Sequence, residues 1–306
     1  MKFLFLFLDG VGLGADDPAI NPLAAAQMPN LRALLGGRGL LAQDAPTETR
    51  QAALLSLDAG LGVPGRPQSA SGQAALLTGR NVPAEIGGHY GPKPNPRIAD
   101  ILGNGNLFKS LRQRGLRAAL LGAYPQTYFQ AIHSGRRLYS AIPLAAVKAG
   151  LRLMTEQDYY AGRALPADFT GQGWREHLGY PDAPLLSPRQ AGKRLAALAR
   201  QLDFAFFEFW LSDFAGHRQD MAAALDMLHT LDRVLGALVD EWPHQEGLIF
   251  LTSDHGNLED LSTRRHTRNP VPALVIGHPA LRAPFVVGLR DLTGVTPAVL
   301  RMYEKG

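Results

Sequence analysis

The stretch Thr252-Ser253-Asp254-His255-Gly256-Asn257 follows directly on the apolar run Gly247-Leu248-Ile249-Phe250-Leu251. The run predicts a buried strand, which would place a carboxylate and an imidazole at its carboxyl end. Open α/β sheets bind their ligands at that edge. Taken alone, Asp254 fits a helix N-cap and His255 an ordinary loop histidine equally well. The role of the pair therefore depends on partners elsewhere in the chain.

Two further predicted strands also end in a carboxylate. The strand Lys2 to Leu8 is followed by Asp9-Gly10-Val11-Gly12, and the glycines allow the backbone to approach a ligand closely. The strand Phe204 to Leu211 is followed by Ser212-Asp213-Phe214-Ala215-Gly216-His217. Asp213 and His217 lie four residues apart, so they face the same way if this turn is helical.

A third histidine and a hydroxyl complete the set. His266 precedes the predicted strand Ala273 to Gly277, and Ser69 precedes the helix-like run Ala74 to Gly79. Ser69 also fits the role of a helix cap, and Ser71 is a competing hydroxyl. Three aspartates, three histidines and a serine form a mixed oxygen and nitrogen set that Zn²⁺ or Mn²⁺ accepts.

The order of these residues resembles the alkaline phosphatase superfamily, especially its branch of cofactor-independent phosphoglycerate mutases and phosphopentomutases. The likeness covers roughly residues 1–90 and 200–280. It implies two divalent metal ions per chain, Mn²⁺ or Zn²⁺ with Mg²⁺ also permitted. The implied ligands are Asp9, Ser69, Asp254 and His255 for one ion, and Asp213, His217 and His266 for the other. The likeness also implies that Ser69 is the nucleophile, because Ser69 rather than Ser71 aligns with the family nucleophile when counted back from Thr78-Gly79.

The pattern of elements predicts an α/β fold with a mostly parallel central sheet and helices on both faces. We expect residues 1–124 and 186–306 to form the metal-binding core, and residues 125–185 to form a small inserted cap lobe that selects the substrate. The aromatic residues of this lobe equally fit a small core of its own. The expected helices are Met28 to Gly37, Leu107 to Gly115, Pro188 to Leu202, Arg218 to Glu241 and Thr296 to Met302.

Bulk properties exclude several classes. The 306 residues contain no cysteine, which rules out disulfides, thiolate zinc sites and cysteine nucleophiles. The net charge of +4 comes without a run of like charges, which argues against a nucleic-acid partner. No apolar stretch approaches the roughly 18–20 residues of a membrane helix, and the apolar start Met1 to Leu8 is too short for a signal peptide. These features predict a cytoplasmic protein without a membrane partner, and they leave the oligomeric state open.

Four polar residues are weaker candidates. Arg80, His89 and Lys93 lie close in sequence to Ser69 and are tentative contacts for a substrate phosphate, although each also fits an ordinary loop residue. Glu208 stands inside an aromatic run, where it is either buried or at a solvated edge.

We predict a phosphatase or phosphodiesterase that acts on a small phosphorylated metabolite through a phosphoserine on Ser69. A lobe of about sixty residues is too small for the large inserted domain that the resemblance associates with phosphoglycerate mutases, so a phosphomutase is the second hypothesis. A catalytically silent protein that binds a phosphorylated ligand through a metal is the alternative from another class. A sulfatase is disfavoured, because Ser69 is followed by Ala70-Ser71-Gly72 rather than by x-Pro-x-Arg.

Overall fold

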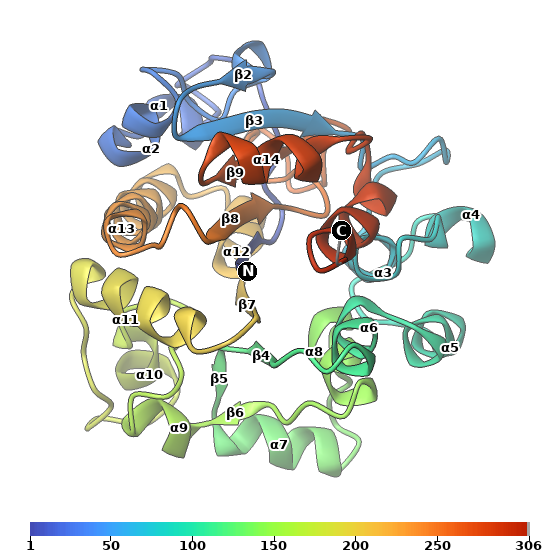
Figure 1. Cartoon of the computed structure of the whole chain (residues 1–306). Coiled ribbons are helices and arrows are strands. Elements are labelled where there is room, and N and C mark those ends of the chain that lie inside the picture. Colours follow the sequence, from blue (N-terminus) through green and yellow to red (C-terminus); the bar gives the residue numbers. More distant parts are fainter. Residues whose placement is uncertain (305–306) are drawn as a thin grey trace.

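A computed structural model describes residues 1–304 and shows a seven-stranded sheet in the order β2-β3-β9-β8-β1-β7-β4 (Figure 1). The strands are β1 (Lys2–Leu8), β2 (Thr47–Glu48), β3 (Ala52–Leu57), β4 (Ala118–Leu120), β7 (Phe204–Phe209), β8 (Gly247–Thr252) and β9 (Val271–Ile276). A separate two-stranded sheet joins β5 (Ala123–Tyr124) to β6 (Met154–Thr155). The strand that carries the Asp-His pair, β8, therefore lies beside the N-terminal strand.

Five strands of the main sheet point the same way. β1 is parallel to both β7 and β8, and β4 is parallel to β7. β9 is antiparallel to β8, and β3 is antiparallel to β9, so β3 again has the direction of β8. Only β9 and β2 run against the other five. The predicted α/β fold with a mostly parallel sheet is confirmed.

The central strand β1 is buried on both faces. Phe3, Phe5 and Phe7 belong to the apolar core on one side of the sheet, whereas Leu4 and Leu6 belong to the core on the other side. Side chains of a strand alternate between the two faces, so an unbroken apolar run is what a strand covered on both sides requires. The sequence Lys2–Leu8 therefore needs helices on each face.

One face is covered by four helices, α1 (Pro22–Ala25), α2 (Pro29–Leu34), α11 (Pro188–Arg200) and α13 (Met221–Asp240), seen to the left in Figure 1. α11 begins with a capping box in which Ser187 and Gln190 satisfy each other's backbone N–H groups. The predicted helix Arg218 to Glu241 starts later than expected, at Met221. Gln219 takes a left-handed backbone conformation, with φ of 55°, and ends the preceding helix α12 (Leu211–Arg218).

The opposite face is covered by α3 (Ser69–Thr78), α5 (Pro96–Asn104), α6 (Leu107–Gln113), α8 (Ala141–Lys148), α14 (Pro279–Val286) and α15 (Val295–Arg301), with α4 (Val82–Ile86) beside α3. The predicted helices at Leu107 and Thr296 are confirmed to within one or two residues at each end. Helices α3 and α8 pack against each other, and both contact α5. This layer positions Ser69, the first residue of α3.

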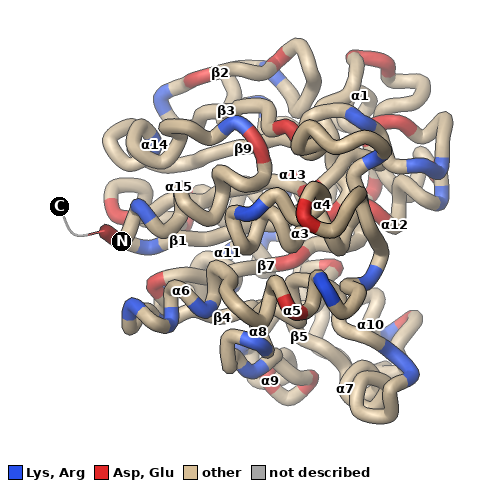
Figure 2. The backbone as a smooth tube through the Cα atoms, turned by 90° about the vertical axis from the view of Figure 1, so that its right-hand side faces the viewer, with Lys and Arg blue, Asp and Glu red and all other residues tan. Residues whose placement is uncertain are grey.

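The division of the chain into a core and a lobe at 125–185 remains a prediction. That segment holds α7 (Gln126–His133), α8, β6, α9 (Glu156–Tyr160) and α10 (Gln172–His177). α8 packs into the core layer, whereas Tyr159 and Trp174 share a smaller apolar cluster with Ala123. Among residues 1–304, none of the helices combines the length and the apolar character that crossing a bilayer requires. In the view of Figure 2, basic and acidic residues are interspersed along the outer helices and loops.

Candidate metal centre

Three parallel neighbours deliver carboxylates to the same edge of the sheet. β1 lies between β7 and β8, and their carboxyl ends are aligned, with Leu8 opposite Phe209 and Phe7 opposite Thr252. Each strand ends just before a polar segment, so Asp9, Asp254 and the helix that bears Asp213 come together. This is the edge at which parallel sheets bind ligands.

Ser69 enters the cluster from the N-terminus of α3. Its Oγ atom lies 3.1 Å from Nε2 of His255, and the residue is 8% exposed. The close approach depends on Gly72, because a Cβ atom there would lie 3.0 Å from the carbonyl oxygen of Asp254. The first turn of a helix has unpaired N–H groups, so its N-terminus stabilises negative charge beside Ser69.

The first predicted ligand group is compact. Nε2 of His255 lies 3.5 Å from Oδ1 of Asp9 and 3.6 Å from Oδ2 of Asp254. Gln73, one turn after Ser69 on α3, donates from Nε2 to Oδ2 of Asp254 at 3.0 Å and to Oδ2 of Asp9 at 3.5 Å. The amide therefore holds two neighbouring carboxylates in place.

The second predicted group is also assembled. α12 is helical, as the spacing of Asp213 and His217 requires, and their Oδ2 and Nε2 atoms lie 3.4 Å apart. Nε2 of His266 lies 3.7 Å from Oδ1 of Asp213 and 3.3 Å from Nε2 of His217. Asp213 also falls within a ligand group with Asp9 and His255, so it stands between the two sets.

The three histidines are oriented in the same way. Nδ1 lies 2.9 Å from the carbonyl of Arg264 in His217, 2.9 Å from that of Pro67 in His266, and 3.3 Å from that of Gly256 in His255. A carbonyl can only accept, so each Nδ1 carries the proton and each Nε2 presents a lone pair to the cluster. This arrangement is typical of metal-binding histidines.

The electrostatics of the cluster also fit a bound cation. Burial, followed by repulsion from Asp254 and Asp213, raises the pKa of Asp9 well above its usual range. Burial likewise raises the pKa of Asp254, and Oδ1 of Asp9 is buried without a hydrogen-bond partner in the described part of the chain. Burial and the neighbouring His255 lower the pKa of His266 to about 4, which keeps this ring neutral. The hydrogen bond with Asp213 raises the pKa of His217, so a cation that binds there competes with a proton. Imidazoles and crowded carboxylates form a donor set suited to divalent cations.

A cavity of about 630 Å³ opens onto the cluster. Asp9, Ser69, Gln73, Asp213 and His217 line its inner part. The other lining side chains come from several segments: Pro92, Lys93, Tyr124, Pro125, Thr127, Tyr128, Arg137, Ser140, Leu178, Glu208, Trp210 and Phe214. The volume is within the usual range for small-molecule sites.

Of the three tentative substrate contacts, only Lys93 lines this cavity. Arg80 instead donates from Nε to Glu85 at 2.8 Å and lines a separate hollow beside α15. Nε2 of His89 lies 3.3 Å from the carbonyl of Val63, and His89 is not among the lining residues. The structure therefore does not bring Arg80 or His89 to the cluster.

The structure adds residues that the sequence interpretation missed. Asn257 donates from Nδ2 to Oδ1 of Asp213 at 2.7 Å, and Gln73 bridges two other carboxylates. Their positions gave a usable signal, since Asn257 follows the Asp-His-Gly turn and Gln73 lies one helical turn after Ser69. Glu208 is buried, with burial raising its pKa to about 7, and it accepts the hydroxyl of Tyr124 at 3.3 Å. Nothing in the sequence around Tyr124 indicated that it lies near the cluster.

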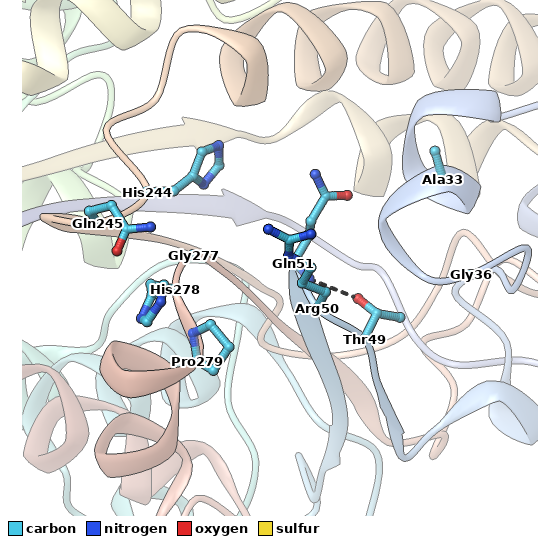
Figure 3. A pocket seen from close by; sticks show the side chains of 10 residues that line it. All are labelled: Ala33, Gly36, Thr49, Arg50, Gln51, His244, Gln245, Gly277, His278 and Pro279. Atoms are coloured by element: carbon cyan, nitrogen blue, oxygen red, sulfur yellow. Dashed lines mark hydrogen bonds between the residues drawn. The ribbon is translucent and has the colours of Figure 1, made fainter.

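A second hollow, of about 680 Å³, lies elsewhere and lacks this chemistry. Figure 3 shows its lining residues, which come from α2 and the turn after it, from the turn between β2 and β3, and from the segments around His244 and His278. His244 lies 2.8 Å from the carbonyl of Val239 through Nε2, and Nδ1 of His278 accepts a backbone N–H at 3.3 Å. No carboxylate is among its lining residues, so we place the candidate site at the Asp9 cluster.

Comparison with known families gives matches to part of the chain. Residues 185–300 match the Metalloenzyme superfamily. A 2,3-bisphosphoglycerate-independent phosphoglycerate mutase from Desulforudis audaxviator is 29% identical over 127 residues, which covers 40% of this chain and 25% of that protein. One from Methylobacillus flagellatus is 31% identical over 133 residues, with the same coverage. The match thus spans about a quarter of the length of these curated relatives.

Solved structures share the fold over the whole chain. The PH0037 protein from Pyrococcus horikoshii has a TM-score of 0.59 at 15% identity, covering 100% of this chain and 98% of that one. The alkaline phosphatase from the Antarctic bacterium TAB5 has a TM-score of 0.56 at 12% identity, covering 98% and 97%. The family and structure comparisons confirm the resemblance predicted from the sequence.

Proposed function

On the premise that this chain carries a Metalloenzyme superfamily domain with an alkaline phosphatase-like fold, we propose that it is a metal-dependent phosphoryl-transfer enzyme. The finer proposal is hydrolysis of a small phosphorylated metabolite through a phosphoserine on Ser69. One observation carries it: the Oγ atom of Ser69, at a helix N-terminus, lies 3.1 Å from His255 and beside a cluster of carboxylates and imidazoles.

The proposed ligands form two neighbouring sets, which meet at Asp213. The first set is Asp9, Ser69, Asp254 and His255, and the second is Asp213, His217 and His266. The inward Nε2 atoms of the histidines and the unpartnered Oδ1 of Asp9 support this assignment. Mn²⁺ or Zn²⁺ suits these donors, and Mg²⁺ is permitted by the carboxylates. Divalent ions in such a site neutralise phosphate oxygens and lower the pKa of a bound hydroxyl or water.

The residues of the chain then have distinct tasks. The Oγ atom of Ser69 gives up its proton to solvent and attacks phosphorus, while the bond from phosphorus to the alcohol oxygen breaks. The departing alkoxide takes up a proton from solvent and leaves as the alcohol. The N-terminus of α3 stabilises the negative charge of the phosphoryl group. Gln73 keeps Asp9 and Asp254 in fixed positions throughout. Attack of water on the phosphoserine releases inorganic phosphate and restores the serine hydroxyl.

A phosphomutase is the second candidate, because the curated relatives that match are named phosphoglycerate mutases. A mutase must retain the alcohol until it attacks the phosphoserine again, which requires a lid that excludes water. The cavity here reaches solvent past Trp210 and Phe214, whose exposed fractions are 45% and 52%. This openness supports hydrolysis over retention.

The test is turnover of p-nitrophenyl phosphate and bis-p-nitrophenyl phosphate by protein loaded with Mn²⁺, Zn²⁺ or Mg²⁺. We expect Ser69→Ala to lower kcat by about 10³-fold or more, whereas Ser71→Ala, which removes the competing hydroxyl, keeps it. Hydrolysis that survives Ser69→Ala would refute the covalent route. Metal uptake without turnover of any ester would favour a silent binding protein. These aryl esters cannot isomerise, so the mutase is tested with 3-phosphoglycerate: its conversion into 2-phosphoglycerate would favour the mutase, whereas release of inorganic phosphate would support the hydrolase.

A further inference from the structure

Two cationic side chains, Lys93 and Arg137, line the cavity. Lys93 follows α4, and Arg137 follows α7, so distant parts of the chain bring them to one cavity. Within residues 1–304, neither Nζ of Lys93 nor the guanidinium of Arg137 forms an ion pair or donates a hydrogen bond to another side chain or carbonyl. Arg80, by contrast, is paired with Glu85. Charges left unpaired in a cavity are available to a ligand.

The two cations also disfavour each other. Burial and then repulsion from Arg137 lower the pKa of Lys93, while Glu208 and Asp9 act in the opposite direction. Arg137 stacks over the ring of Tyr128, with its Cζ atom 4.9 Å from the ring centroid, so its position is fixed although it is exposed. An anion between the cations would relieve their repulsion.

The hydroxyl of Tyr128 also favours an anionic ligand in this cavity. Tyr128 is 8% exposed, and its hydroxyl is buried without a hydrogen-bond partner among residues 1–304. Burial raises the pKa of Tyr128, so the hydroxyl stays protonated and can donate. A buried donor without an acceptor is costly unless a ligand supplies one. Tyr128 lines the same cavity as Lys93 and Arg137.

We propose that Lys93, Arg137 and the hydroxyl of Tyr128 form a subsite for a second anionic group, a carboxylate or a phosphate, on the alcohol part of the phosphoester. This inference rests on the proposed function and adds a substrate class to it: phosphoesters whose leaving group is itself an anion. Three carboxylates line the cavity as well: Asp9 and Asp213 belong to the proposed metal ligands, and Glu208 accepts the hydroxyl of Tyr124.

The test compares three aryl phosphates of similar shape: 4-carboxyphenyl phosphate, 1,4-phenylene bisphosphate and the neutral control 4-carbamoylphenyl phosphate. We expect the Mn²⁺-loaded protein to prefer at least one anionic ester over the carbamoyl ester by about 10- to 100-fold in kcat/KM, the range given by hydrogen bonds to a charged group. The preferred ester tells whether the subsite accepts a carboxylate or a phosphate.

Variants then assign the preference to residues. Arg137→Gln, Lys93→Gln and Tyr128→Phe should each raise KM for the preferred anionic ester with little change for the carbamoyl ester. Arg136→Gln is the matched control, because Arg136 is exposed, donates to Ser134 and does not line the cavity. An equal decrease in kcat/KM for all three esters would indicate a general structural effect and would overturn the assignment.

Binding separates this inference from the proposed function. Calorimetry on Ser69→Ala protein with the three esters needs no turnover, and we expect tighter binding of the preferred anion, weakened by Arg137→Gln. If wild-type protein hydrolyses all three esters equally and Arg137→Gln changes none, the subsite is wrong and the hydrolase stands. If no ester turns over but the anionic ester binds more tightly through Arg137, the subsite stands and the hydrolase fails.

Discussion

Glu259 accepts the backbone N–H of Gly12 at 2.9 Å and thereby ties the loop after β1 to the loop after β8. The same carboxylate accepts the N–H of Asn257 at 2.8 Å, Nδ2 of Asn269 at 3.1 Å and the hydroxyl of Thr267. These residues lie in the three loops that carry the ligands of strands β1 and β8 and the late histidine. One buried side chain, 2% exposed, therefore fixes their relative positions.

Replacing Glu259 with glutamine should disturb this arrangement. The amide keeps one acceptor oxygen but places an NH₂ group against backbone donors, which costs about 1–3 kcal/mol of unfolding free energy. Because the loops hold the ligands, we expect Mn²⁺ affinity to fall by about 10- to 100-fold. Urea unfolding and Mn²⁺ titration measure the two effects. Glu246→Gln, at an exposed position, is the control and should change neither. Unchanged Mn²⁺ affinity in the Glu259 variant would contradict the positioning role.

Metal binding should stabilise the fold, because the crowded carboxylates of the cluster repel one another when the cations are removed. At a free Mn²⁺ concentration 100 times Kd, the gain is about 2.7 kcal/mol, or a rise in Tm of about 5 °C for a chain of this size. Calorimetric scans before and after treatment with a chelator measure it. Asp254→Asn should reduce the shift, and Asp226→Asn, on the exposed side of α13, should not. The same shift in both variants would count against Asp254 as a ligand.

Asp158 should stabilise the segment between α8 and α10 in a pH-dependent way. The hydrogen bond from Arg152 is the main cause that lowers the pKa of Asp158, and Thr155 and Arg163 contribute. A carboxyl with a lowered folded pKa adds stability above its unfolded pKa, near 3.9, and loses it as the pH falls towards the folded value. Both arginines are mostly exposed, so we expect Asp158→Asn to cost only about 1–2 kcal/mol at pH 7.

Urea unfolding at pH 7 and at pH 3 checks the sign of this effect. The difference in unfolding free energy between wild-type and Asp158→Asn protein should shrink at pH 3, because the carboxyl of the unfolded chain is then mostly protonated, which reduces the advantage of the folded carboxylate. The unfolding free energy of the control Asp226→Asn should stay within about 0.5 kcal/mol of the wild-type value at both pH values. A difference that grows on acidification would show that Asp158 does not act as a paired carboxylate.

The sequence indicated that several of the inner residues lie together, because Asp9 and Asp254 follow strands and Ser69 begins a helix. An apolar run fixes where a strand ends, so Asp9 and Asp254 could be assigned to one edge of the sheet before the structure was known. Asp213 and His217 needed only the helical period. The proposed roles of these residues await the experiments described above, but their proximity agrees with the sequence analysis.

The outer wall of the cavity could not be predicted in this way. Arg80, like His89 and Lys93, is a tentative contact because it is close in sequence to Ser69, but Arg80 forms an ion pair with Glu85 and does not line the cavity. Arg137 and Tyr128 reach the cavity through the packing of α7, which has no periodic signal strong enough to place it. The position of such residues in space is set by tertiary packing. No local pattern in a single sequence predicts it.

Gly192, on α11, marks the closest approach of the two helices that cover one face of the sheet. A Cβ atom there would lie 2.9 Å from both Cβ of Ala237 and the backbone N of Leu238, and closer still to the carbonyl oxygen of Val234. Since backbone atoms of α13 cannot move aside cheaply, Gly192→Ala should lower the unfolding free energy by about 1–3 kcal/mol.

The matched control for Gly192→Ala is a helical glycine with free space. At Gly103, on α5, a Cβ atom would meet only the flexible side chain of Lys148, at 3.7 Å. Gly103→Ala should therefore stabilise the protein by about 0.5–1 kcal/mol, because alanine favours the helix. Urea unfolding of both variants compares the two effects directly. A loss of stability at Gly103 as large as that at Gly192 would mean that helix packing is not the cause, and an unchanged Gly192→Ala protein would show that α11 and α13 can move apart.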